Sequence, residues 1–132
     1  MANGNLCTNN GRKIAIHRCF EASPTLSAPN YFSVGTGTTT PASSDTALET
    51  AIQIGGADSK AIVTGYPTFN DVGFSATTRC LILTTECNAN TITEFGLVNT
   101  DGTPLLFSRA VFTGIAKTTS VQCIFVTKDK IT

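Results

Sequence analysis

The sequence predicts an all-β protein, a single-domain β-sandwich or jelly-roll-like barrel with at most one short helical turn. Threonine is the most frequent polar residue, with 23 copies, and β-branched side chains suit strands and the turns between them. About eight short apolar runs follow one another, with turn residues roughly every 8 to 15 positions. No interval has the length and period of the helices that connect parallel strands.

Length and composition favour one domain without an electrostatic partner. The chain has 132 residues, a formal net charge of +0, 14% charged and 41% hydrophobic residues. Nucleic acids and anionic membranes are therefore not expected as partners. Residues 1–12 carry four asparagines and two glycines, so we expect an extended N-terminal arm there and one β domain over residues 13–132.

The first half of the β domain is predicted to hold two strands, a loop and one helical turn. Residues 13–20, KIAIHRCF, show an imperfect two-residue period and are interpreted as the first strand. Two prolines then predict a loop before the short strand 31–35. Asp45 stands before Leu48 and Ile52, which are four residues apart, and this spacing predicts one helical turn.

The second half is strand-rich. Residues 61–69 and 72–86 form two apolar runs, and the segment Cys80-Leu81-Ile82-Leu83 predicts a central strand covered on both faces. Residues 91–112 read as two strands joined at a turn over positions 99–102. Residues 120–128 alternate and predict a last strand.

The stretch SVGTGTTTPASSDTAL, residues 33–48, is the one glycine-rich segment that could hold a phosphate. A phosphate-binding loop needs a lysine and a helix directly after the glycines, but Gly37 is followed by three threonines and Pro41, and the next lysine is Lys60. The flanking apolar residues argue against a flexible linker. We therefore expect an ordered loop that crosses the domain.

No catalytic, metal-binding or cofactor-binding residues are predicted. The single histidine, His17, lies in an apolar strand pattern, and a hydrolase centred on it would need a second acid or base close in space. The five cysteines lack the spacing of a zinc site, and we expect free thiols that pack as small apolar residues. No apolar stretch is long enough for a membrane helix or a secretion signal.

Glu94 and Arg109 lie on either side of the predicted turn at positions 99–102. If the two strands pair around Asp101, about seven positions back and forward bring the two side chains together. The sequence therefore predicts an ion pair across the two strands. A guanidinium on an apolar strand could instead cover hydrophobic surface or reach a neighbouring subunit.

Two segments together resemble a pattern in small virion structural proteins of tailed bacteriophages. These are GTGTTTPASSDTALET, residues 35–50, and TEFGLVNTDGTPLLFSRAVFTGIAKTTS, residues 93–120. From residue 35 to residue 120 the pattern spans roughly two-thirds of the chain, with its two segments in the right order. On that pattern the matching positions, which the resemblance implies are fold and assembly residues, are Asp45, Leu48, Glu94, Gly96, Leu97, Asn99, Gly102, Leu105, Leu106, Arg109, Phe112 and Lys117. The last strand of such proteins often carries a tryptophan, where this chain has Phe125.

The resemblance implies a non-enzymatic virion protein, made in the host bacterial cytoplasm, that stabilises the particle as a homo-oligomer, of which a trimer is one form. Its partners would be copies of itself and virion proteins such as the major capsid protein or tail proteins. Capsid decoration (cement) protein, neck or tail component and fibre base remain open as its station. The alternative is a host- or glycan-binding adhesive module of a phage tail, against which the absence of tryptophan counts.

Overall fold

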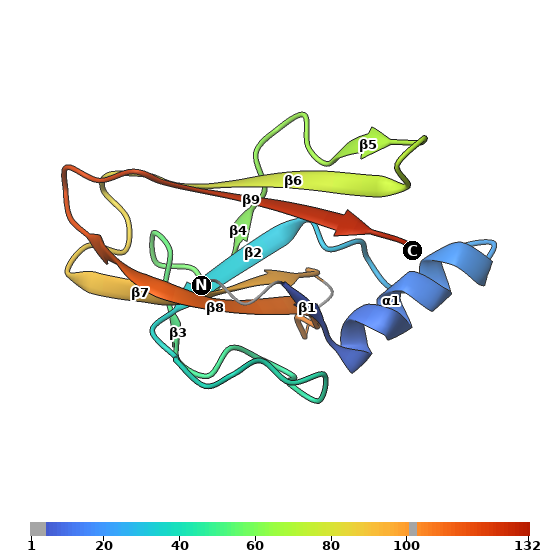
Figure 1. The fold of residues 1–132 in the computed structure, drawn as a ribbon, viewed down its shortest axis with the longest axis horizontal. Helices are drawn as coiled ribbons and strands as arrows, with labels where there is room; N and C mark the ends of the chain where they lie inside the picture. Colours follow the sequence, from blue (N-terminus) through green and yellow to red (C-terminus); the bar gives the residue numbers. More distant parts are fainter. Residues whose placement is uncertain (1–4, 101–102) are drawn as a thin grey trace.

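The computed structural model describes residues 5–100 and 103–132, and it consists of two antiparallel β-sheets packed face to face with one helix at one end (Figure 1). The all-β sandwich predicted from the sequence is therefore confirmed. The larger sheet contains β1 (Leu6–Cys7), β2 (Tyr31–Gly35), β3 (Ala51–Ile52), β4 (Lys60–Ala61), β7 (Asn90–Val98) and β8 (Leu106–Lys117). The smaller sheet contains β5 (Thr68–Asn70), β6 (Ser75–Ile82) and β9 (Cys123–Lys130).

The strand order of the larger sheet is β1-β8-β7-β2-β3, and β4 also pairs with β2. The smaller sheet has the order β5-β6-β9, so β6 is central and β9 is an edge strand. The predicted hairpin over residues 91–112 is present as β7 and β8, in which Gly96 lies opposite Arg109. Gly102 and Asp101, at the tip of this hairpin, lie outside the described residues.

The core lies between the two sheets. Phe32 and Leu97 are paired across β2 and β7, and both are almost completely buried. They face Cys80 and Ile82 of β6, which have no exposed surface. Burial of each large side chain of this kind contributes about 1.5–3 kcal/mol. Leu83, directly after β6, is 41% exposed, so the prediction that this segment is covered on both faces is wrong.

The strand predicted over residues 13–20 is wrong, because residues Asn9–Phe20 form the helix α1. The Thr8 hydroxyl caps this helix by accepting the N–H of Gly11 at 3.0 Å. Within α1 only Gly11 and Ile14 are buried. Such a narrow buried stripe leaves no helical period in the sequence, and the chance alternation of Ile14 and Ile16 looks like a strand.

The predicted extended arm 1–12 is corrected over the part that the structure describes. Residues 6–7 form β1, which pairs with Arg109 and Ser108 of β8, and the helix already begins at Asn9. The helical turn predicted after Asp45 is also absent, and the chain instead turns into β3. The one helix is therefore longer than predicted and lies in a different place.

Candidate functional site

Residues 36–50, between β2 and β3, form an ordered loop that Glu94 holds against the larger sheet. Glu94 is completely buried, and it points away from the core because its neighbour Phe95 packs between the sheets. Its carboxylate accepts three backbone N–H groups of the loop, from Gly37 (3.1 Å), Glu49 (3.1 Å) and Thr50 (2.8 Å). One buried side chain therefore anchors both ends of this loop.

Arg109 completes the anchor from the neighbouring strand. Its Nε donates to Glu94 Oε2 at 3.0 Å, which confirms the predicted ion pair between the two strands. Its Nη1 donates to Asp45 Oδ2 at 2.8 Å, and Nη2 lies 3.6 Å from Glu49 Oε2. Only 3% of Arg109 is exposed, so three carboxylates share one buried guanidinium. We call Asp45, Glu49, Glu94 and Arg109 the loop clamp.

Asp45 takes part in the loop clamp and does not begin the helical turn that the sequence predicts. Its carboxylate accepts the backbone N–H of Ala42 at 3.0 Å as well as the Arg109 guanidinium. Both interactions favour the ionised form and hold the pKa of Asp45 below its ordinary value, whereas burial opposes them. Asp45 therefore closes a local turn and fastens that turn to β8.

Gly96 and Leu48 meet beside the clamp. A Cβ atom at Gly96 would lie 2.7 Å from Leu106 Cδ1 and 3.0 Å from Leu48 Cδ2, closer than side-chain carbons can approach. Glycine at this position therefore allows Leu48 of the loop to pack directly on the backbone of β7. Leu48 belongs to the first segment of the resemblance and Gly96 to the second, so the two segments are in contact here.

The remaining pattern residues are buried or sit beside an edge strand. Asn99 is completely buried and its Oδ1 accepts the N–H of Leu105 at 2.8 Å, which holds the end of the hairpin. Lys117 is 1% exposed, and its Nζ donates to Asn88 Oδ1 at 2.8 Å and to Thr118 O at 2.9 Å. Phe112 is partly buried and contacts Phe125 across the sheets, with ring centroids 5.7 Å apart.

The loop clamp is a structural device. Neither the groove nor the cleft described below is lined by Glu94 or Arg109, and the groups of the clamp bind one another and the backbone. His17 lies elsewhere, on α1, where its Nδ1 is 2.6 Å from Glu21 Oε1 and Thr25 is the next neighbour. Among residues 5–100 and 103–132, no Ser or Cys side chain forms a hydrogen bond with His17.

In the described part of the chain, no group of three or more His, Cys, Asp or Glu side chains could hold a metal ion. The helix that the structure describes is also too short and too polar to span a membrane. The five cysteines are free, as expected, and burial raises the pKa of Cys80 to about 12.

A groove opens where the two sheets end side by side. β8 pairs with β1 only at Ser108 and Arg109, and beyond these residues its outer edge has no partner strand in the described residues. β9 is likewise unpaired along one edge over Cys123–Lys130. Between these two edges lies a groove of about 500 Å³, which we call the open-edge groove.

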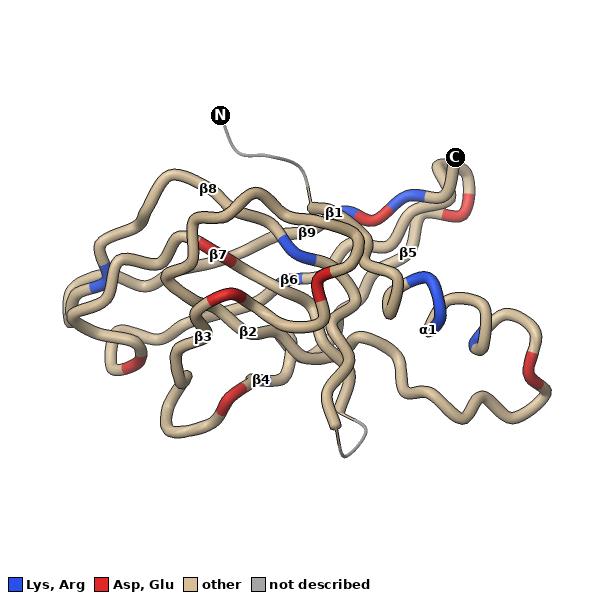
Figure 2. Tube along the Cα trace, turned by 90° about the horizontal axis from the view of Figure 1, so that it is seen from below, with Lys and Arg blue, Asp and Glu red and all other residues tan. Residues whose placement is uncertain are grey.

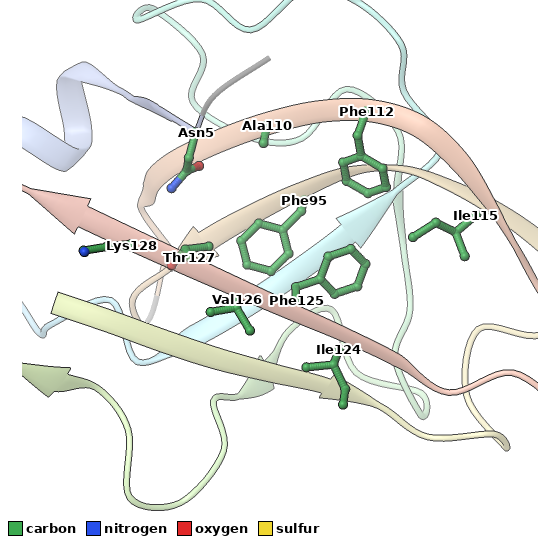
Figure 3. A pocket seen from close by; sticks show the side chains of 10 residues that line it. All are labelled: Asn5, Phe95, Ala110, Phe112, Ile115, Ile124, Phe125, Val126, Thr127 and Lys128. Atoms are coloured by element: carbon green, nitrogen blue, oxygen red, sulfur yellow. The ribbon is translucent and has the colours of Figure 1, made fainter. Parts of the chain in front are cut away.

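The open-edge groove is apolar and rich in aromatic rings (Figure 3). Its floor is a stack of Phe95 on Phe125, with ring centroids 5.2 Å apart, and Phe112 lies beside them. Ile124 and Val126 of β9 reach its rim and are 48% and 63% exposed. Lys128 is the one charged residue of the lining, and elsewhere charges of both signs are scattered along the chain (Figure 2).

Sequence reasoning found Phe112 but missed the rest of this groove. The sequence predicts an ordinary last strand over residues 120–128, in which the exposed Ile124 and Val126 alternate with Cys123 and Phe125, which face the core. A last strand that is apolar on both faces is the signal that could have indicated a surface to be covered. The edge position of β9 depends on the whole topology and has no local signal.

Known proteins do not identify this chain by similarity. No protein-family model matches it, and no match was found among curated proteins or among solved structures.

Proposed function

We propose that this protein is a non-enzymatic structural protein of a bacteriophage particle, which assembles with copies of itself on the capsid or tail surface and stabilises the particle. The observation that carries this proposal is the open-edge groove, where apolar side chains lie between two strand edges without partners. Free edges and large exposed apolar side chains are features that soluble monomers usually avoid.

Strand addition is the mechanism that this geometry supports. A strand from a second copy would complete the backbone hydrogen bonds of β8 beyond Arg109 or of β9, and its alternate side chains would enter the groove against Phe112 and Phe125. Each such contact is small. The symmetry of a ring or shell multiplies it, so that modest contacts hold a stable particle.

The loop clamp supports the same proposal in a different way. Most of the described residues that match the virion pattern, with Glu94 and Arg109 at their centre, are buried in the sandwich, whereas Asp45, Leu48, Leu105 and Phe112 are partly exposed. In a structural protein these residues would preserve the shape that presents the open edge. The partners on the particle would be virion proteins such as the major capsid protein or tail proteins, and the location would be the virion.

Molar mass in solution tests the proposal. Size-exclusion chromatography with light scattering should give a multiple of the 13.8 kDa chain mass for the wild type, and a lower multiple for Val126→Lys, which adds a charge at the groove rim. Val72→Lys is the matched control, because Val72 is 91% exposed and does not line the groove. A wild type that stays monomeric at high concentration would contradict self-assembly.

A further inference from the structure

A second cleft, of about 830 Å³, lies at the end of the sandwich where α1, β5 and the C-terminal end of β9 come together (Figure 1). Phe69, Ala76 and Asp129 form one row across β5, β6 and β9, because Phe69 pairs with Ala76 and Ala76 with Asp129. This row continues the core-facing side of the smaller sheet, since Thr78 and Cys80 occupy the same side further along β6. Here α1 and Phe107 form the opposite wall. We call this space the end cleft.

Asp129 places a carboxylate without a cation in the end cleft. Its oxygens accept Asn5 Nδ2 and the Thr127 hydroxyl, each at 3.3 Å, and within the described residues it has no ion pair. Lys128 and Lys130 precede and follow Asp129 on β9, are exposed and, like Asp129, line the cleft, but neither forms an ion pair with it. Burial raises the pKa of Asp129, and the hydrogen bonds from Thr127 and Asn5 only partly offset this rise.

Asn5 adds a second acceptor at the same place. Its amide nitrogen is bound to Asp129, whereas its Oδ1 is buried and has no hydrogen-bond partner in the described residues. A buried amide oxygen without a donor is unfavourable by about 1–3 kcal/mol. The cleft thus presents two oxygen acceptors, of which the Asp129 carboxylate carries a negative charge, and its lining also holds the charged residues Asp71, Lys128 and Lys130.

The walls of the end cleft are apolar and uncovered. Phe69 is 73% exposed, Phe74 is 68% exposed and Ile131 is 79% exposed, and all three line the cleft. A small molecule that filled the space near Asp129 would leave most of these side chains in water. An occupant that covers them must extend along the cleft beyond its charged group.

We propose that the end cleft binds a primary ammonium group on an apolar stem, and that this group is a lysine side chain of a neighbouring protein of the particle. The ammonium donates to the Asp129 carboxylate and to Asn5 Oδ1, its methylene stem lies against Phe69 and Phe74, and the flanking residues of the partner cover Ile131. The assignment of the ammonium group to a neighbouring protein of the particle rests on the proposed function. The binding of an ammonium group in the end cleft does not rest on it.

The test uses two-dimensional NMR of the full chain, titrated with n-butylammonium as the analogue of a lysine side chain. The shifts should concentrate at Asp129, Asn5 and Phe69, and n-butyrate should produce none there. Asp129→Asn should weaken binding by about tenfold, the loss of one charge-assisted bond. The distant and exposed Asp58→Asn is the matched control. Equal affinity in wild type and Asp129→Asn, with native spectra for both, would overturn the proposal.

A second arm identifies the source of the ammonium group. A capped Leu-Lys-Leu peptide should bind more tightly than n-butylammonium, because it also covers Phe69 and Ile131, and the same peptide with acetyl-lysine should not bind. Phe69→Ala should weaken the peptide more than the free amine. A peptide that binds no better than the amine would overturn the assignment to lysine. The titrations are repeated on Val126→Lys, which blocks the open-edge groove and leaves the end cleft intact. Binding of the amine should be unchanged in this variant, so failure of the end-cleft proposal can be distinguished from failure of self-assembly.

Discussion

The Arg109 guanidinium and the Glu94 carboxylate form an ion pair on the side of the larger sheet that faces away from the core, with Nε 3.0 Å from Oε2 and at most 3% of either residue exposed. The pair joins two neighbouring strands and, through Asp45 and the N–H groups of residues 37, 49 and 50, it fixes the fifteen-residue loop 36–50. The loop clamp therefore links the two parts of the resemblance pattern in space.

Arg109→Met should strongly destabilise the protein. The change leaves the Glu94 carboxylate buried without its cation, and loss of one partner of a buried pair is unfavourable by about 3–5 kcal/mol. Urea denaturation followed by circular dichroism measures the free energy of unfolding. Arg79→Met, at an exposed position of β6, is the control and should change it by less than about 0.5 kcal/mol. Equal effects of the two changes would refute the clamp.

Gly96→Ala should destabilise the protein by about 1–3 kcal/mol through overpacking. The new methyl group would lie 2.7 Å from Leu106 Cδ1 and 3.0 Å from Leu48 Cδ2. Shortening a neighbour should relieve part of the strain, so the double variant Gly96→Ala with Leu48→Ala should lose less than the sum of the two single losses. Additive losses in thermal denaturation would show that the two residues are not in contact.

Acid should weaken the clamp. The pKa of Asp45 is lower in the folded protein than its ordinary value of 3.8, so its stabilising contribution is fully present above about pH 5 and is lost as the pH falls through the folded pKa. Asp45→Asn removes this contribution, and its free energy of unfolding should fall less steeply between about pH 5 and pH 2 than that of the wild type. Parallel pH profiles would contradict the assignment.

The thiols should react in order of burial. Cys19 is exposed, whereas Cys80 is completely buried and its pKa is raised to about 12. An alkylating reagent at neutral pH should therefore modify Cys19 first and Cys80 only on unfolding. Mass spectrometry of the digested protein at successive times gives the order. Modification of Cys80 in the folded protein at the rate of Cys19 would contradict the burial described here.

The hairpin of β7 and β8 could be predicted because its register depends on a turn only a few residues away. Counting from the turn was enough to bring Glu94 and Arg109 together. The helix α1 could not be predicted, since two buried residues, Gly11 and Ile14, attach it to β8 and the other positions show no helical period.

The positions of the open-edge groove and the end cleft could not be predicted from the sequence, because each depends on long-range pairing. Asp129 and Phe69 share one row only because both β5 and β9 pair with β6, and β9 is far from β5 and β6 along the chain. The open edge of β9 follows from the absence of a partner strand, which depends on the order of the whole sheet. Local pattern predicts strands and turns, while the order of strands in a sheet requires tertiary structure.

Hydrogen exchange at two protein concentrations tests the central claim most directly. If copies add strands at the open-edge groove, the backbone amides of β8 beyond Arg109 and of β9 should exchange more slowly in concentrated than in dilute protein, while those of the exposed β5 should not change. Val126→Lys should abolish the difference. Exchange at β8 and β9 that does not depend on concentration in an oligomeric sample would place the contact elsewhere and contradict the proposed assembly edge.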